Sequence, residues 1–236
     1  MPLGLIGLGF IPSLAWLSYY LRKDCHPEPR YLIARVFFMG ILIAPLAVLA
    51  QWLFSQIGLT FSASFSISDS ILFFIIAAFI EETVKFLAVK YTVLHNSKFD
   101  EPVDAMIYMI IAGLGFAAVE NILVMFQAIE RGLPAALQIW GLRFVGATLL
   151  HALSSAIAGY FLGMSWFYGD HSKKIISLGI LIATLFHATF NIIISNFSNS
   201  SIGFVYLLGL LMFMAILISI LFSRLKHRML STSDFS

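Results

Sequence analysis

The chain has little charge and almost no cysteine. Only 11% of its 236 residues are Asp, Glu, Lys or Arg, whereas a soluble domain carries about 25%. Its single cysteine, Cys25, excludes a disulfide within the chain and a Cys-based metal motif. The net charge of +2 is small, and the basic residues are not interleaved with aromatic ones. Nucleic acid is therefore not an expected partner.

Hydrophobic residues, in contrast, make up 60% of the chain. Water cannot solvate such an apolar surface, so the lipid bilayer is the expected partner. The apolar runs are about 18 to 24 residues long, which suits membrane-spanning helices and not the roughly ten alternating residues of a barrel strand. We predict an all-α, polytopic membrane helix bundle that forms a single membrane-embedded domain over residues 1–236 in the cell membrane.

Seven apolar runs are each long enough to cross a bilayer of about 30 Å at 1.5 Å per residue. The first run has no basic segment before it and no A-x-A cleavage site, so we expect an uncleaved span. The predicted spans are Leu3–Leu21, Leu32–Phe54, Ser70–Val89, Val103–Phe126, Phe144–Trp166, Ile175–Ser195 and Ile202–Phe222.

The loop charges predict the orientation. Lys and Arg follow spans one, three, five and seven, while the connections after spans two and six have neither. The connection after span four is the exception, with Arg131 next to Glu130 and Arg143 where span five begins. Because cytoplasmic loops are enriched in Lys and Arg, the N-terminus is expected outside and the C-terminus inside. The segment Leu133–Arg143 contains Pro134 and Trp140 and is predicted to be a short surface helix on the outer side.

Several polar residues lie inside the spans, where an ionisable group costs at least about 2.5 kcal/mol near the centre. Such residues face the bundle interior or a water-filled cavity, so spans three to six should bring their polar faces together. These residues are Glu81, Glu82, Lys85, Glu120, Asn121, His151, Ser154, Ser155, Thr184, His187, Asn191 and Ser195.

Their spacing refines this expectation. Glu81 and Lys85 share one helical face, and Glu82 points about 100° away, so it need not share their ion pair. Thr184, His187, Asn191 and Ser195 form one polar stripe at helical spacing that is expected to face inward. Carboxylates and imidazoles together suit general-base chemistry and oxyanion stabilisation. Asp104, Tyr108 and Phe116 are expected to be packing or interface residues.

The depth of these groups follows from helical rise. Counted from the predicted span ends, Glu81, Glu120, His151 and His187 fall within roughly 9–18 Å of the outer surface. The polar cluster is therefore expected in the outer half of the bilayer.

The motifs Glu81-Glu82-x-x-Lys85, Phe116-x-x-x-Glu120-Asn121, His151 and His187-x-x-x-Asn191 occur in this order, each in its own span. In this the chain resembles the PrsW family of bacterial intramembrane proteases, distant relatives of the CAAX prenyl endopeptidases. The resemblance covers a motif-bearing core of about residues 70–195. The prenyl endopeptidases have a histidine where Glu120 stands.

The resemblance implies endoproteolysis of a single-span membrane protein in a bacterial cytoplasmic membrane, the known example being an anti-sigma factor. It implies that Glu81 or Glu82 activates a water. The histidines would assist or bind the oxyanion, to which Asn191 would donate. Glu120 would orient a histidine, and Lys85 would hold the glutamate pair. The implied catalytic residues are Glu81, Glu82, Glu120, His151, His187 and Asn191, supported by Lys85, Phe116, Asn121 and Ser155.

Three alternatives remain open from the sequence. His151, His187 and Glu120 would make a His₂Glu zinc set, but there is no HExxH motif, and a metal-free glutamate mechanism without a committed cofactor is favoured. Ionisable groups in spans also mark proton- or cation-coupled transporters, although no repeated halves are visible. A non-catalytic membrane scaffold of the same fold is the third alternative.

Overall fold

The computed structural model describes residues 2–22, 26–61, 71–197 and 200–233. Cys25 and most of the connection after the second predicted span lie outside this part of the chain. The described residues are helical and contain no β-strand. The α-helices are α1 Pro2–Leu21, α2 Arg30–Phe61, α3 Ile71–Thr92, α4 Asp104–Ala128, α5 Leu133–Val145, α6 Ala147–Ser165, α7 Ser172–Phe197 and α8 Ser201–Ser233.

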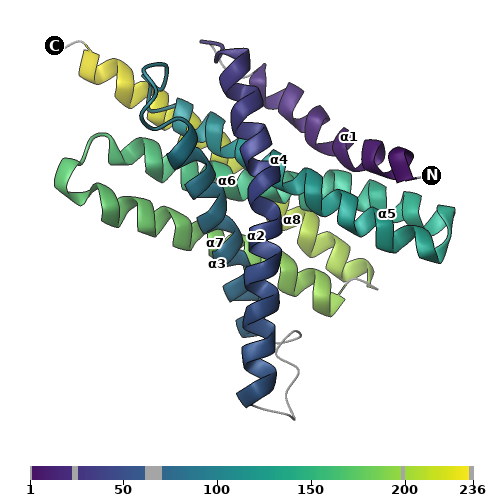
Figure 1. Cartoon of the computed structure of the whole chain (residues 1–236). Helices are drawn as coiled ribbons and strands as arrows, with labels where there is room; N and C mark the ends of the chain where they lie inside the picture. The colour runs from purple at the N-terminus through teal and green to yellow at the C-terminus, as the bar shows by residue number, and fades with distance from the viewer. Residues whose placement is uncertain (1, 23–25, 62–70, 198–199, 234–236) are drawn as a thin grey trace.

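The prediction of a polytopic helix bundle is confirmed. Among the described residues, six helical segments are long and apolar enough to cross a membrane. The 22-residue α3 is of similar length but carries Glu81, Glu82 and Lys85 in its interior. The N- and C-termini lie on opposite sides of the molecule (Figure 1), as the seven predicted crossings would require. The direction of the bundle across the membrane stays a prediction.

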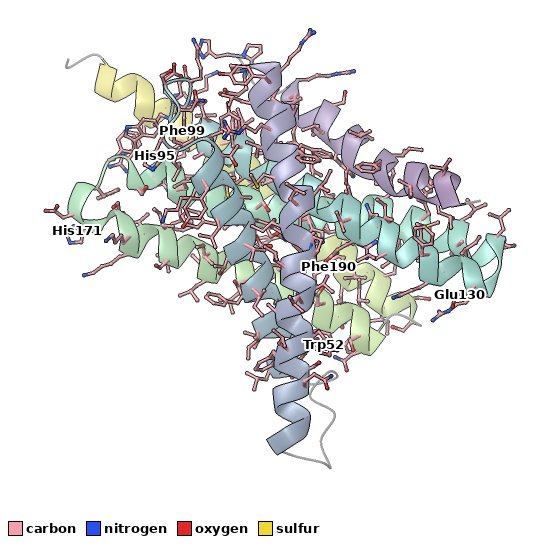
Figure 2. All side chains as sticks on the ribbon, in the orientation of Figure 1. Trp52, His95, Phe99, Glu130, His171 and Phe190 are labelled. Carbon is pink, nitrogen blue, oxygen red and sulfur yellow. The ribbon has the colours of Figure 1, made fainter. Side chains whose placement is uncertain are left out.

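Successive connections also lie on opposite sides. Figure 2 shows Glu130, which follows α4, and His171, which precedes α7, at opposite ends of the bundle. This alternation is what the loop charges require, because one of these connections is predicted outside and the other inside.

Helix α4 is the centre of the bundle, packed against α1, α2 and α6. Every residue from 104 to 118 is buried. Its approach to α2 is so close that a Cβ at Gly40 would overlap the Ala112 carbonyl oxygen, and one at Gly115 would overlap that of Phe37. Helices in lipid associate through such close packing of small residues, because burial of apolar surface gains little there.

Close packing at glycines also joins α4 to α6, the helix that carries His151. A Cβ at Gly113 would overlap Ser155 Oγ, and one at Gly159 would meet Met106 Cα at 2.6 Å. Any larger residue at these glycines would push α6 away from α4. The geometry around His151 therefore depends on this close contact.

Helix α5 is longer than the predicted surface helix and is tied to the bundle. It begins after Gly132, whose φ of 97° favours glycine, and ends at Val145. Only Gly146 separates it from α6. Trp140 Nε1 donates to the Leu8 carbonyl oxygen at 2.8 Å, which fixes α5 against α1. The predicted fifth span therefore begins inside α5 and is bent at Gly146.

Asp104 and Tyr108 have the packing role that was predicted. Asp104 Oδ2 accepts hydrogen bonds from the backbone N–H groups of Asp100 and Glu101, at the start of α4. The Tyr108 hydroxyl donates to Glu28 Oε2 at 2.5 Å. The Asp104 contacts hold the connection that leads into α4, and the Tyr108 contact fastens the segment before α2 to the second turn of α4.

Candidate active site

Three helices bring charged and titratable residues together in the bundle interior. Helix α3 supplies Glu81, Glu82 and Lys85, α6 supplies His151, and α7 supplies His187. All five side chains are buried, between 0% and 6% exposed. The sequence predicted that these polar faces converge, and the contacts between the side chains confirm it.

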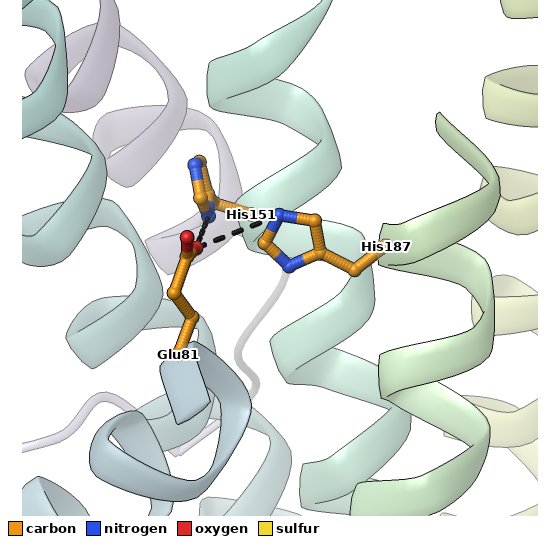
Figure 3. Close-up of side chains that lie close together, drawn as sticks. All are labelled: Glu81, His151 and His187. Carbon is orange, nitrogen blue, oxygen red and sulfur yellow. Dashed lines mark ion pairs between the residues drawn. The ribbon is translucent and has the colours of Figure 1, made fainter. Parts of the chain in front are cut away.

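The carboxylate of Glu81 faces both imidazoles (Figure 3). Its Oε2 lies 3.5 Å from His187 Nε2 and 4.0 Å from His151 Nδ1. Its Oε1 accepts a hydrogen bond from Gln51 Nε2 at 2.9 Å. Gln51 therefore aims Oε2 at the histidines, and Oε2 itself is a buried oxygen with no hydrogen-bond partner among the described residues.

The carboxylate of Glu82 is held by three groups at one oxygen. Its Oε1 accepts from Lys85 Nζ at 2.8 Å and from Ser154 Oγ at 2.9 Å, and it lies 2.8 Å from His187 Nδ1. Lys85 is farther from Glu81, at 3.8 Å. Lys85 therefore contacts both glutamates, and its contact with Glu82 is the closer one, because residues three apart on a helix are neighbours as well as residues four apart.

Glu120 contacts Nε2 of His151, the ring nitrogen that points away from Glu81. Glu120 Oε2 lies 2.9 Å from His151 Nε2 and 3.1 Å from Arg143 Nη2. Arg143 Nε also donates to Asn121 Oδ1 at 2.7 Å, and Asn121 Nδ2 donates to Thr148 Oγ1 at 3.0 Å. The Glu120-Asn121 pair of α4 is therefore clamped by α5 and α6.

These contacts assign the protons on both imidazoles. A carboxylate only accepts hydrogen bonds, so His151 Nε2 and His187 Nδ1 must carry the N–H groups that face Glu120 and Glu82. In the neutral imidazoles, His151 Nδ1 and His187 Nε2 then carry their lone pairs on the side of Glu81. Lys85 Nζ, 2.8 Å from His151 Nδ1, donates to that lone pair, which agrees with the assignment.

Glu81, His151 and His187 form a group with metal-ligand spacing. One ligand atom from each lies within 4.8 Å of the others. The set predicted from the sequence had Glu120 in place of Glu81. In the structure Glu120 binds the far nitrogen of His151, which is the place of the outer carboxylate in carboxylate–histidine–metal arrangements.

Phe116 and the serines complete the surroundings. The Phe116 ring lies 5.6 Å from the His151 ring, and Lys85 Nζ stands 4.7 Å from its centroid, a cation–π contact. Ser154 donates to Glu82, whereas the predicted supporting residue Ser155 packs against Gly113.

The polar stripe on α7 faces inward only in part. Thr184 and His187 are buried, while Asn191 is half-buried and Ser195 is exposed. Thr184 Oγ1 donates to the Ile180 carbonyl oxygen in its own helix. The expectation of a wholly inward stripe is therefore wrong for Ser195.

Two residues of the cluster were not identified from the sequence. Gln51 interrupts the apolar run Leu32–Phe54, and this isolated amide was a usable signal. Arg143 has the local sequence of a membrane-interface residue. It was missed because the sequence does not reveal that α5 folds back along α4 (Figure 1).

A polytopic helix bundle with a buried carboxylate–imidazole cluster has the side chains that a membrane-embedded hydrolase needs. Comparison with known proteins identifies the family. Residues 28–220 match the family described as PrsW family intramembrane metalloprotease. The chain belongs to the PrsW family and is a peptidase and a multi-pass membrane protein, which confirms the resemblance seen in its motifs and sets aside the transporter and scaffold alternatives.

The relatives match over most of their length. Protease PrsW of Oceanobacillus iheyensis is 33% identical over 227 residues, which cover 95% of this chain and 96% of the relative. Protease PrsW of Bacillus subtilis is 30% identical over 200 residues, covering 83% of this chain and 84% of the relative. Protease PrsW of Clostridioides difficile is 28% identical over 197 residues, with coverage of 82% and 80%. No solved structure matches the chain significantly.

Proposed function

We propose that this chain is an endopeptidase of a bacterial cytoplasmic membrane that cuts a single-span membrane protein, such as an anti-sigma factor, close to or just outside its extracytoplasmic boundary. The observation that carries the proposal is the buried group of Glu81, His151 and His187. Its two imidazoles have their lone pairs on the side of one carboxylate oxygen. As a purely structural contact, such a group would be costly in lipid.

We further propose that this group binds one zinc ion. One carboxylate and two neutral imidazoles are a donor set that catalytic zinc sites use. Glu81 Oε2 is buried without a hydrogen-bond partner among the described residues, which suits an oxygen that serves a cation. Glu120 and Glu82 already occupy the outer positions on the two imidazoles. Together with the family description, this donor set favours a metal over the metal-free mechanism expected from the sequence.

The ion would act as a Lewis acid that polarises the scissile carbonyl and activates water. His151 Nδ1 accepts a hydrogen bond from Lys85 Nζ in this structure and would have to exchange that bond for the ion. With Glu81 Oε2 serving the ion, the proton of the attacking water would go to Glu82 Oε2, which is buried and not hydrogen-bonded to any described residue. Asn191, one turn beyond His187, donates to the developing oxyanion.

The exposed edge of the cluster supports the proposed side of cleavage. The side chains of Glu120 and Arg143 are 25% and 19% exposed, whereas Glu81, His151 and His187 are at most 7% exposed. In the predicted orientation Arg143 belongs to the outer connection and Glu120 lies near the outer end of α4. This exposed edge is then on the outer side of the cluster, which supports entry of water from outside the cell.

The test is a cleavage assay with the purified full chain in detergent. The substrate is a single-span test protein labelled on both sides of its membrane segment, and mass spectrometry maps the new termini. We expect a cut at or just beyond the outer boundary, abolished in Glu81→Gln and retained in Asp104→Asn, a buried carboxylate outside the cluster. A cut on the cytoplasmic flank, or full activity of Glu81→Gln, would contradict the proposal.

A further inference from the structure

An apolar cavity of about 320 Å³ lies where α5 meets α6, next to α7 and α8. Its side chains are all aliphatic or aromatic, and two glycines, Gly141 and Gly146, leave part of its wall without a side chain. Phe190 and Ile194 of α7 and Leu208 of α8 close other sides. No charged or hydrogen-bonding side chain of the described residues lines it, so its occupant must be apolar.

The cavity adjoins the Glu81–His151–His187 group. Phe190 follows His187 by three residues, about 4.5 Å along α7, and Gly146 precedes His151 by five residues, about 7.5 Å along α6. The two cavity residues lie close together, since a Cβ at Gly146 would stand 3.5 Å from Phe190 Cζ. In the predicted orientation Phe190 and Gly146 both lie on the outer side of the two histidines. The partly exposed side chain of Arg143 lies on this side as well.

We propose that this cavity is the subsite for one bulky apolar side chain of the substrate, such as Leu or Phe, close to the bond that is cut. The inference rests on the proposed function. A cavity of about 150 Å³ lined by Leu, Ile and Phe holds a benzene molecule, so this larger one has room for such a side chain. A peptide whose carbonyl lies at the cluster places a neighbouring side chain within a few ångströms, at the distance of Phe190.

This subsite would give the enzyme its sequence preference. Near the membrane a substrate side chain is already in apolar surroundings, so simple burial gains little. The preference must come from close packing, because an unfilled cavity forfeits dispersion contacts with its lining. A single methylene in an apolar pocket changes specificity about 10–200-fold. We therefore expect at least about tenfold selection of Leu over Ala at one substrate position.

Gly141 offers a direct way to fill the cavity. A Cβ built there meets no atom within 4 Å, so Gly141→Phe fits without displacing the backbone. Gly209 of α8 provides the matched control, because its Cβ also meets nothing, yet this residue is exposed and does not line the cavity. Both variants place the same side chain on a helix of the same bundle.

The experiment uses single-span peptides with a leucine-rich membrane segment and six randomised residues at its outer boundary. Wild-type protein, Gly141→Phe and Gly209→Phe digest the mixture in detergent, and mass spectrometry identifies the residues around each cut. The expected result is selection of Leu, Ile, Met or Phe at one position by the wild type and by Gly209→Phe. Gly141→Phe should cut peptides with Leu at that position at least about tenfold more slowly, and should prefer peptides with Ala or Gly there.

The outcomes separate this inference from the proposed function. Cleavage by the wild type without apolar selection, or an unchanged preference in Gly141→Phe, overturns the subsite and leaves the protease intact; the latter result is also what a lipid chain in the cavity would give. Failure of the wild type to cut any peptide counts against the proposed function, and the subsite falls with it.

Discussion

Glu120 joins His151 to Arg143 through a single carboxylate oxygen, Oε2, at 2.9 Å from His151 Nε2 and 3.1 Å from Arg143 Nη2. The imidazole of α6 is thereby connected to α5, the helix that borders the apolar cavity. The link fixes which nitrogen of His151 carries the proton, and so which lone pair faces Glu81.

This link predicts a graded effect on metal affinity. Glu120→Ala should weaken zinc binding about 10–100-fold, the range for loss of an outer carboxylate on a ligating histidine. Arg143→Met, one contact farther away, should weaken it less, and Arg143→Lys less still because the charge remains. Chelator competition with the purified proteins measures the affinities. Wild-type zinc affinity in Glu120→Ala would show that Glu120 does not orient His151 for a metal.

The three-residue group predicts metal content. Purified protein should contain about one zinc per chain by elemental analysis, because the group supplies the three protein ligands of a catalytic zinc site. Glu81→Ala, His151→Ala and His187→Ala should each lose the metal together with cleavage. A positioned acid or base contributes about 10²–10⁴-fold to the rate, so Glu82→Ala should lose activity by that factor while it keeps much of its metal. Metal-free protein that cleaves at full rate would refute the zinc proposal.

The pair of Lys85 and Glu82 predicts an effect on stability. Both side chains are fully buried, with Nζ and Oε1 2.8 Å apart. Lys85→Met leaves the Glu82 charge without its cation, and loss of one partner of a buried pair costs about 3–5 kcal/mol. The free energy of unfolding in mixed detergent measures this loss. The double variant Lys85→Met/Glu82→Gln should recover much of it, and equal instability of the single and double variants would speak against the pair.

The loop charges predict the labelling of single cysteines placed in a Cys25→Ser background. Cysteines at Ser62 and Asn199, which lie outside the described residues, should react with an impermeant reagent added to intact cells. Cysteines at Ser97 and Ser172 should react only after the cells are opened. Labelling of Ser97 from outside would reverse the predicted orientation and with it the proposed side of cleavage.

The sequence by itself determined the class of fold and the charged and imidazole side chains at the centre of the cluster. Long apolar runs leave the backbone no alternative to helices in lipid, and ionisable residues inside them must face inward whatever the packing. Glu81, Glu82, Lys85, His151 and His187 therefore follow from the residue pattern alone. The order of the motifs along the chain likewise led to the family.

Only the tertiary structure decided which group contacts which. Helical spacing placed Lys85 beside Glu81, but the packing of α6 and α7 against α3 brings it closer to Glu82. The packing of α3, α6 and α7 against one another sets the distances that put Glu81, and not Glu120, next to both imidazoles. Such contacts depend on the rotation and separation of helices far apart in sequence, which the residues of one helix do not specify.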